Sequence, residues 1–391
     1  MTGRRRAFIS EVGRTTWRAF KLAFLSGLVA GLVAAAVYPS WVAAQSDAIV
    51  VFTEPIETPG LTWVVSELTD EPRLEEISLA GSPTTIARPG GDGPWPAVVF
   101  LNGATRRGRF HPDVRAVARG LARAGYVAFV PDVPGVRTGE ITTRTVRGAV
   151  AAVRAALRED DVEGGEAALY GVSTGASLAL LVAEDASVAE RITLVAGIAP
   201  YTDLRDVVRL ATTGYHSVGG SLRRYDVDPF VTLVAARSLA AALPPGRDRR
   251  LLLDELQAVD DEDENPLAVL REVRAARLGR RATDLVELLV NVDPQRFDRL
   301  YARLPAAARS DLELLSPITK AGDLRAPVEI ASAPHDKYFP VSESRELARV
   351  APDVRITVTE TLAHAIPEPS PGALGDLFRF DAFLVRVLHE S

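Results

Sequence analysis

The sequence predicts an α/β protein with a mostly parallel, doubly wound sheet. From residue 73 onwards, short apolar runs of strand length alternate with stretches of helical length. The run at 97–101 is apolar throughout, as expected of a parallel strand that helices cover on both faces. A serine flanked by glycines, at 171–175, separates a strand-like run from a helix-like run. These observations together define the fold class.

Each element of the expected sheet has a local justification. Residues 74–79 alternate polar and apolar side chains with the period of a half-buried strand, and 84–87 is the expected hairpin partner. Gly125 marks the end of the first core helix. Further strands are expected at 97–101, 126–131, 166–170, 192–196, 326–331 and 354–358, and helices at 114–124, 145–158, 176–183, 342–350 and 374–389.

The strand–helix alternation stops between residues 201 and 318. Apolar residues there recur at helical spacing, as in 250–256 and 285–290, which predicts packed helices. An all-helical block between two sheet strands has the layout of a lid, here inserted before the penultimate strand. The acidic run 260–264 is expected to be a solvated loop or a helix start, with a cation site as the alternative.

Composition restricts the possible function classes. The 391 residues are 47% apolar and 25% charged, which is ordinary for a globular protein. A net charge of −6 gives no electrostatic support for nucleic-acid binding, so no nucleic-acid partner is expected. Cysteine is absent from the sequence, which excludes disulfides, thiolate metal sites and a cysteine nucleophile. The sequence shows neither metal-ligand spacing nor a phosphate-loop pattern, so no metal and no cofactor is expected.

The N-terminus carries a signal for cellular location. Residues 1–21 are basic, whereas residues 22–44 contain no charge and would measure about 34 Å as a helix, against roughly 30 Å of hydrocarbon. Tyr38 and Trp41 fall where an aromatic belt would meet the far membrane interface. The positive-inside rule keeps residues 1–21 in the cytoplasm and sends the following chain across the membrane.

A single-pass anchor in the cell membrane is therefore expected, with the catalytic domain on the extracytoplasmic side. Residues 45–72 are expected to be a linker between the transmembrane helix and the first strands. A cleaved export signal that ends near 42–44, and a buried hydrophobic hairpin, are the alternatives.

The pentapeptide Gly171-Val172-Ser173-Thr174-Gly175 is a nucleophile-elbow pattern, G-x-S-x-G, in the strand-to-helix setting where that pattern has a mechanical meaning. So tight a turn requires a strained serine backbone and neighbours without side chains. It presents the serine hydroxyl at the start of the following helix, where free N–H groups and the helix dipole favour a developing negative charge. The pattern predicts a serine hydrolase, and a plain turn serine is the alternative.

With its elements in this order, the chain resembles the α/β-hydrolase family over roughly residues 73–391. Asp336 lies in a loop that ends at Pro340 and looks like the acid loop of that family. His364 lies in a loop that looks like the family's histidine loop, and the order nucleophile, acid, histidine is the family's order. The implied domains are an α/β-hydrolase core at 73–200 and 319–391 and a helical lid at 201–318.

The resemblance implies a catalytic triad of Ser173, Asp336 and His364. His364 would take the proton of Ser173 as the hydroxyl attacks a carbonyl, and would then return it to the leaving group. Asp336 would hold the imidazole in the required tautomer and stabilise the imidazolium.

The resemblance also implies an oxyanion hole made of two backbone N–H groups, one at Thr174 and the other at Ala104. Asn102 stands where histidine is common in the family. This departure is tolerable because the expected donor in that loop belongs to the backbone.

Other titratable residues receive less specific assignments. Asp203 follows the strand at 192–196, where some relatives carry the acid, and is the alternative to Asp336. Asp132 is expected to shape a turn. The histidines outside the triad are expected at structural or surface positions, with a substrate contact as the alternative for the first: His111, His216, His335 and His389.

The expected function is the hydrolysis of small or medium carboxylic esters through an acyl-enzyme. The alternatives are an acyltransferase that uses the same triad, a peptidase or amidase of the same fold, and a non-catalytic scaffold tethered to a membrane. The expected partners are a small-molecule acyl ester and, through the N-terminal helix, a membrane. The sequence does not indicate the oligomeric state.

Overall fold

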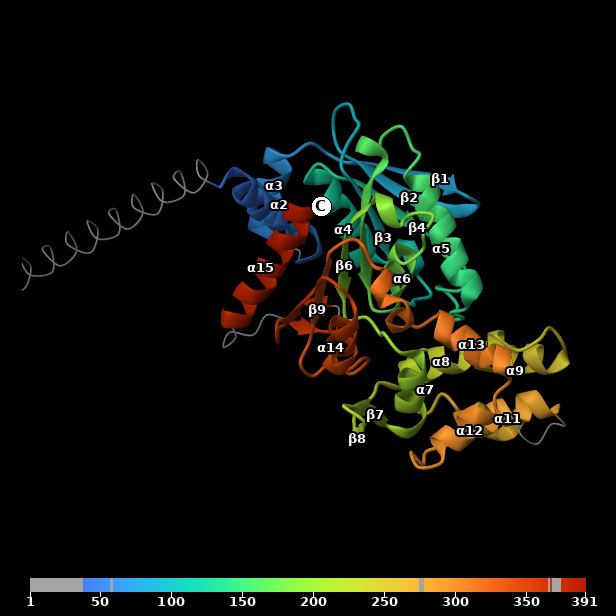
Figure 1. The fold of residues 1–391 in the computed structure, drawn as a ribbon. Helices are drawn as coiled ribbons and strands as arrows, with labels where there is room; N and C mark the ends of the chain where they lie inside the picture. The colour runs from blue at the N-terminus through green and yellow to red at the C-terminus, as the bar shows by residue number, and fades with distance from the viewer. Residues whose placement is uncertain (1–37, 57–58, 274–277, 365, 368–373) are drawn as a thin grey trace, which may run out of the picture.

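The computed structural model describes residues 38–391 except 57–58, 274–277, 365 and 368–373. Within this part of the chain, an eight-stranded sheet forms the centre of the molecule (Figure 1), with the strand order β1-β2-β4-β3-β5-β6-β9-β10. Its strands are β1 Arg73–Leu79, β2 Ser82–Arg88, β3 Ala97–Leu101, β4 Val127–Pro131, β5 Ala167–Val172, β6 Ile192–Ile198, β9 Val328–Ser332 and β10 Val354–Val358.

Most of the sheet is parallel. β2 pairs in antiparallel orientation with both β1 and β4, and the pairs from β4 through β3, β5, β6 and β9 to β10 are parallel. β3 and β4 are buried along their whole length, which explains why their sequences are continuously apolar. The predicted α/β class and mostly parallel sheet are confirmed.

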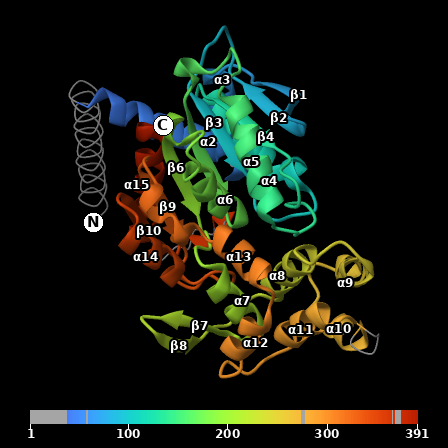
Figure 2. The same ribbon diagram turned by 45° about the vertical axis from the view of Figure 1, so that its right-hand side comes forward.

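The helices around the sheet are α2 Pro39–Ile56, α3 Pro59–Leu68, α4 Pro112–Arg123, α5 Thr143–Ala156, α6 Thr174–Ala183, α14 Val341–Val350 and α15 Leu374–Glu390. They cover both faces of the sheet (Figures 1 and 2). A hydrophobic cluster lies on each face of the sheet, and β3 contributes to both because side chains alternate along a strand. Val99 belongs to the cluster with α5 and α6, and Phe100 belongs to the cluster with α2, α4 and α15.

Proline and capping side chains fix where two of the helices begin. The side chain of His111 accepts a hydrogen bond from the N–H of Asp113 (3.4 Å) just before α4, whose first residue is Pro112. The Asp228 carboxylate accepts from the N–H of Phe230 (3.0 Å) at the start of a later helix, Pro229–Ala241. Proline has no N–H to donate, so it is used in the first turn, where the backbone N–H groups have no partner within the helix.

The segment before the sheet differs from the linker predicted at 45–72. α2 and α3 occupy most of it, and α2 packs against α4 and α15 with Ala44, Ala48 and Val51 buried. These residues recur at helical spacing and form an apolar stripe, so the segment belongs to the folded domain. A Cβ atom at Gly120 of α4 would lie 2.5 Å from the Val51 carbonyl oxygen, which shows how closely the two helices approach.

The predicted membrane span, 22–44, is only partly within the described residues. Residues 1–37 lie outside them, and so does the basic segment 1–21. Residues 39–44 form the beginning of α2. Among the helices of the described chain, none combines the length and the apolar character needed to cross a membrane.

An insertion occupies the chain between β6 and β9, at the lower end of the molecule in Figure 1. Leu233, Leu252 and Phe297 belong to a hydrophobic cluster of its own. The backbone N–H of Ile318 donates to the carbonyl of Thr202 (3.1 Å), so the two ends of the insertion meet. Its elements are α7 Leu204–Thr213, β7 Tyr215–Val218, β8 Ser221–Arg224, α8 Pro229–Ala241, α9 Arg247–Ala258, α10 Ala268–Val273, α11 Arg280–Leu289, α12 Phe297–Arg303 and α13 Ala306–Leu314.

The prediction of an all-helical insertion is wrong at the β7–β8 hairpin. Gly219 and Gly220 have φ angles of 56° and 81° and form the two-residue turn between the strands. The strands are short, and apolar spacing in the flanking helices dominates the local pattern. Two short features complete the described fold: the ladder of β11 Leu362–Ala363 with β12 Ile366–Pro367, and the 3₁₀ turns Gly108–Phe110, Glu163–Gly165, Ala189–Arg191, Pro317–Thr319 and Ala321–Asp323.

The acidic run 260–264 lies in the loop between α9 and α10, as predicted. Asp261 does more than face solvent, because it pairs with Arg106 of the core (3.0 Å) and with the buried Arg237 of α8 (2.8 Å). The loop therefore fastens the insertion to the core.

Candidate active site

Ser173 occupies the turn between β5 and α6. β5 ends at Val172 and α6 begins at Thr174, so Ser173 alone reverses the chain, with φ 54° and ψ −126°. A non-glycine residue in this region is strained. A Cβ at Gly171 would lie 2.5 Å from the Gly175 carbonyl oxygen, and a Cβ at Gly175 would lie 1.9 Å from another backbone oxygen, so only glycine fits at either position.

Asp336 and His364 lie together. The Nδ1 atom of His364 is 2.8 Å from Oδ2 of Asp336, whose side chain is fully buried. The other carboxylate oxygen, Oδ1, accepts from the backbone N–H groups of Tyr338 (2.7 Å) and Phe339 (3.1 Å). These bonds fix the direction of the carboxylate, because its two oxygens have different partners.

The pair determines which nitrogen of the histidine is free. An ionised carboxylate only accepts hydrogen bonds, so Nδ1 of His364 is the donor and Nε2 of the neutral ring is left as the basic nitrogen. His364 itself has a positive φ of 56°, at the turn between β11 and β12. Its side chain is 13% exposed, so it remains accessible from one side.

The loop predicted to carry an oxyanion donor lies beside Ser173. A Cβ at Gly103 would be 3.3 Å from Cβ and 4.0 Å from Oγ of Ser173. The side-chain amide of Asn102 donates to the Gly103 carbonyl (2.9 Å), so this residue shapes the loop. Ala104 is the next residue and is half-buried, and Thr174 is the first residue of α6.

A cavity of about 660 Å³ lies between the sheet and the insertion. Ser173 and Thr174 line it from the core, and Val234 and Leu312 line it from the insertion. Tyr338 also lines it, and its ring centroid is 4.2 Å from that of His364. The Asp336–His364 pair therefore packs against the wall of the cavity that Ser173 lines.

The insertion holds the acid loop from the outside. The hydroxyl of Tyr225, just after β8, donates to the backbone carbonyl of Asp336, and the N–H of Asp228 donates to the carbonyl of Lys337 (2.6 Å). Burial, reinforced by the nearby Asp336 carboxylate, raises the pKa of Tyr225, so its hydroxyl stays a donor. No local pattern in the sequence signals this contact, because it joins two distant segments.

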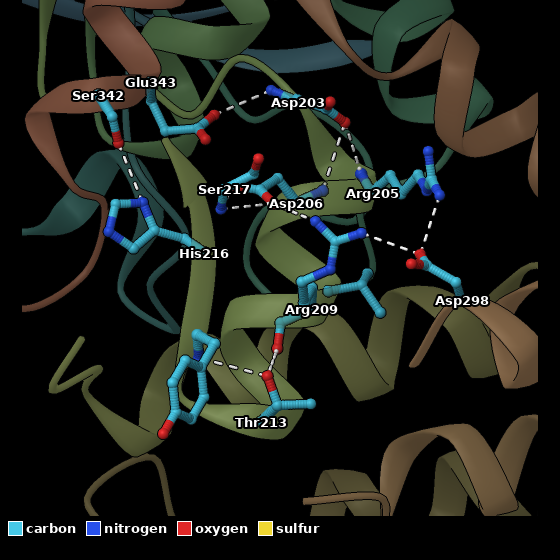
Figure 3. A network of polar contacts seen from close by, with 12 residues as sticks. Asp203, Arg205, Asp206, Arg209, Thr213, His216, Ser217, Asp298, Ser342 and Glu343 are labelled. Atoms are coloured by element: carbon cyan, nitrogen blue, oxygen red, sulfur yellow. Dashed lines mark hydrogen bonds and ion pairs between the residues drawn. The ribbon is translucent and has the colours of Figure 1, made fainter. Parts of the chain in front are cut away.

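A buried carboxylate also ties the helix after the acid loop to the start of the insertion (Figure 3). Glu343 of α14 accepts from the backbone N–H groups of Thr202 (2.7 Å) and Asp203 (2.9 Å) and from the Thr202 hydroxyl (3.0 Å). Burial raises the pKa of Glu343 to about 7. Next to it, Ser342 bonds Nδ1 of His216 in the hairpin (3.1 Å).

The alternative candidates have structural roles. Asp203 caps α7 by accepting from the N–H of Arg205 (2.8 Å) and does not pair with His364. Asp132 forms ion pairs with Arg109 (2.5 Å) and Arg137 (3.4 Å), a role beyond the predicted turn.

The remaining histidines are placed mostly as expected. His111 caps α4, His335 is exposed beside the acid loop, and the ring of His389 meets Trp41 edge-on at 4.7 Å. His216 is buried between the hairpin and α14, which is a structural position as expected. Within the described ranges, no three His, Cys, Asp or Glu side chains gather as metal ligands would.

No family model and no curated protein matches the chain. Among solved structures, it is similar to acylaminoacyl peptidase of Pyrococcus horikoshii, with 12% identity over 76% of this chain and 38% of that one, at a TM-score of 0.44. Proline iminopeptidase of Mycobacterium smegmatis matches with 16% identity over 81% of this chain and 99% of that one, at 0.42. Dienelactone hydrolase of Anabaena variabilis matches with 13% identity over 81% and 97%, also at 0.42. The chain thus spans only 38% of the length of the first of these proteins.

Proposed function

We propose that the chain is a serine hydrolase that cleaves carboxylic esters through an acyl-enzyme. Ser173 is the nucleophile, His364 the general base and acid, and Asp336 the residue that orients the histidine. One observation carries the proposal: the His364–Asp336 pair, at 2.8 Å, packs on the wall of the cavity that the strained Ser173 lines.

The chemistry follows from the protonation states of this pair. The neutral imidazole carries its proton on Nδ1, so Nε2 can accept the Ser173 proton as Oγ attacks the ester carbonyl. The imidazolium that results is stabilised by the buried carboxylate and then protonates the departing alcohol. Water repeats the sequence on the acyl-enzyme and releases the acid.

The oxyanion that forms at the attacked carbonyl needs donors that are already in place. The backbone N–H groups of Thr174 and Ala104 are the proposed donors, because the loop of Gly103 lies against Ser173 and α6 begins directly after it. Loss of one such donor typically costs about 3 to 4 kcal/mol of transition-state stabilisation.

The cavity favours an apolar acyl group. Its volume of about 660 Å³ suits a small or medium ligand, and most of its wall is apolar, as at Val231, Leu239 and Leu315. Because the insertion supplies part of that wall, we propose that it acts as the lid of the site and sets the acyl preference.

The direct test is labelling with a fluorophosphonate probe. Wild type should be labelled and Ser173→Ala should not. Ser238→Ala is the matched control, because Ser238 lines the same cavity but bonds the carbonyl of Gly139 (3.1 Å) away from the turn. Equal labelling of wild type and Ser173→Ala would refute the proposal.

A panel of p-nitrophenyl esters of graded acyl length then measures the substrate preference. Added alcohols or amines distinguish hydrolysis from acyl transfer through the products, and peptide substrates test the peptidase or amidase alternative. An intact fold with no turnover on any of these substrates would favour the non-catalytic scaffold.

We also propose that the N-terminal segment anchors the chain in the cell membrane, with the catalytic domain on the extracytoplasmic side. The support is the sequence: six basic residues precede the uncharged run, Arg4, Arg5, Arg6, Arg14, Arg18 and Lys21. Protease treatment of intact cells should remove the domain, whereas protection of the domain would contradict this location. N-terminal sequencing of the mature chain distinguishes the anchor from an exported form after signal cleavage.

A further inference from the structure

One side of the molecule exposes an unusual number of large apolar side chains. More than half of the strongly exposed large apolar residues in the described part of the chain lie on α2, α3 and α15. α2 contacts both other helices, and Figures 1 and 2 show α2 beside α15 where the described chain begins and ends. The residues of this apolar face are Trp41, Ile49, Trp63, Val64, Leu68, Leu377 and Phe378, with Tyr38 directly before α2.

Several side chains of this apolar face are too exposed to solvent to belong to the core of the domain. Leu68 is 80% exposed, Phe378 72% and Trp63 66%. Single exposed apolar residues are normal on a protein surface, but a concentration of them marks an interaction site. Tyr and Trp are also the side chains that favour the interface between hydrocarbon and water.

The position of the apolar face along the chain identifies its partner. Residues 22–38 carry no charge, and Pro39 already begins α2, whose Ala44 is buried against the core. A helix of residues 22–38 would measure about 26 Å, slightly less than the roughly 30 Å of hydrocarbon in a bilayer. Since α2 and α3 belong to the domain, no spacer remains between an anchored segment and the folded chain.

Resting on the proposed N-terminal anchor, we propose that the apolar face of α2, α3 and α15 docks on the lipid bilayer that holds this anchor. Tyr38 and Trp41 then lie at the interface beside the end of the anchor, and Leu68 and Phe378 enter the outer part of the same leaflet. The catalytic domain is held against the membrane, and the insertion, which starts after β6, lies away from α2 and α3 (Figure 1).

The charges on these helices indicate docking by apolar contact. Arg379 pairs with Asp376 (2.5 Å), and Arg386 pairs with the buried Glu329 (2.9 Å), so both arginines of α15 have partners within the chain. Attraction to anionic headgroups is screened by salt, whereas burial of apolar surface is not. Docking should therefore persist at high ionic strength.

Fluorescent labelling of the full chain in lipid vesicles tests this proposal. Because the chain has no cysteine, each label can be placed by a single substitution without removing others. Leu68→Cys and Phe378→Cys carry an environment-sensitive nitrobenzoxadiazole label on the apolar face. Val292→Cys, 78% exposed in the insertion, is the matched control. The background is Ser173→Ala, so the result is independent of turnover.

In phosphatidylcholine–phosphatidylglycerol vesicles, the labels at 68 and 378 should shift to the blue and lose fluorescence to doxyl lipids, at low and high salt alike. The label at 292 should do neither. Adding Leu68→Glu should reduce the quenching of the label at 378, and this exposed position tolerates the change without unfolding, which a thermal melt checks.

Two results would overturn the proposal. If the chain fails to float with the vesicles, the proposed anchor fails as well; if it floats while the labels at 68 and 378 remain unquenched by doxyl lipids, only the docking fails. In the second case, energy transfer between labels on different copies would identify a second copy of the chain as the partner of this face.

Discussion

Replacing Asp336 by asparagine separates the orientation of His364 from the packing of the acid loop. Oδ1 of Asp336 accepts from two backbone N–H groups, at 2.7 and 3.1 Å. The asparagine oxygen keeps these two bonds, so its NH₂ group is directed at Nδ1 of His364. Two donors cannot bond, and the imidazole turns to the tautomer with its proton on Nε2, where it no longer accepts the Ser173 proton.

Asp336→Asn should lower kcat far more than it lowers the free energy of unfolding. The same exchange in the serine-protease triad lowers kcat by about 10⁴, or roughly 5 kcal/mol of activation free energy, because the tautomer is wrong. In the other tautomer Nδ1 accepts from the asparagine NH₂, and even complete loss of this buried hydrogen bond would lower the free energy of unfolding by only about 1 to 3 kcal/mol. Asp336→Asn should therefore remain folded and lose nearly all turnover.

The assay is kcat for a p-nitrophenyl ester, with thermal unfolding measured on the same sample. Asp203→Asn is the matched control: Asp203 caps α7, and asparagine caps a helix as well as aspartate does, so activity and stability should both be retained. Activity of Asp336→Asn within tenfold of wild type, or an equal loss in Asp203→Asn, would refute the reasoning.

Three further predictions concern the support of the site. Tyr225→Phe removes the hydroxyl that holds the acid loop, and should lower kcat by about two- to tenfold, the value of one hydrogen bond, with KM unchanged; a raised KM alone would contradict this role. Gly175→Ala brings a Cβ within 1.9 Å of a backbone oxygen and should destabilise the fold by about 3 kcal/mol or more in a denaturant titration, whereas Gly322→Ala, with no atom within 4 Å, should not. Burial raises the pKa of Glu184 from 4.5 to about 8, and one of its oxygens has no partner within the described residues. Between pH 4.5 and about pH 8, Glu184 therefore keeps its proton in the native state but has lost it in the unfolded chain. The free energy of unfolding should fall as the pH rises from 4.5 to about 8. Glu184→Gln should flatten that slope and raise the melting temperature at about pH 8; an unchanged slope would show that Glu184 does not cause it.

The parts of the fold that sequence predicts are those with local causes. Continuous apolar runs such as 97–101 and the glycines around Ser173 each carry their reason within a few residues, because burial on both faces or a steric limit selects them. The order of Ser173, Asp336 and His364 is likewise visible in the sequence, and the structure joins the last two by a hydrogen bond of 2.8 Å.

The parts that sequence does not predict depend on tertiary contacts. Ala44, Ala48 and Val51 form an apolar stripe, but the sequence does not show which helix this stripe packs against. Tyr225 and Glu343 form hydrogen bonds with segments far from them in sequence. A tyrosine or a glutamate can bond many groups, so the residue type alone does not predict the partner. The β7–β8 hairpin is too short for alternation to outweigh its helical surroundings.

The contact between the two ends of the insertion has a kinetic consequence. β6 must find β9 as its parallel neighbour, in the register Val195 to Val328, although a long stretch of chain separates them. A separate hydrophobic cluster lets that stretch collapse by itself, and its ends then lie next to each other. The flexible loop that must be closed then shortens from about a hundred residues to a few. This shortening lowers the entropic cost of pairing β6 with β9 by about 3 kcal/mol. A unit that begins and ends at one point can also be enlarged or exchanged without moving the strands that flank it.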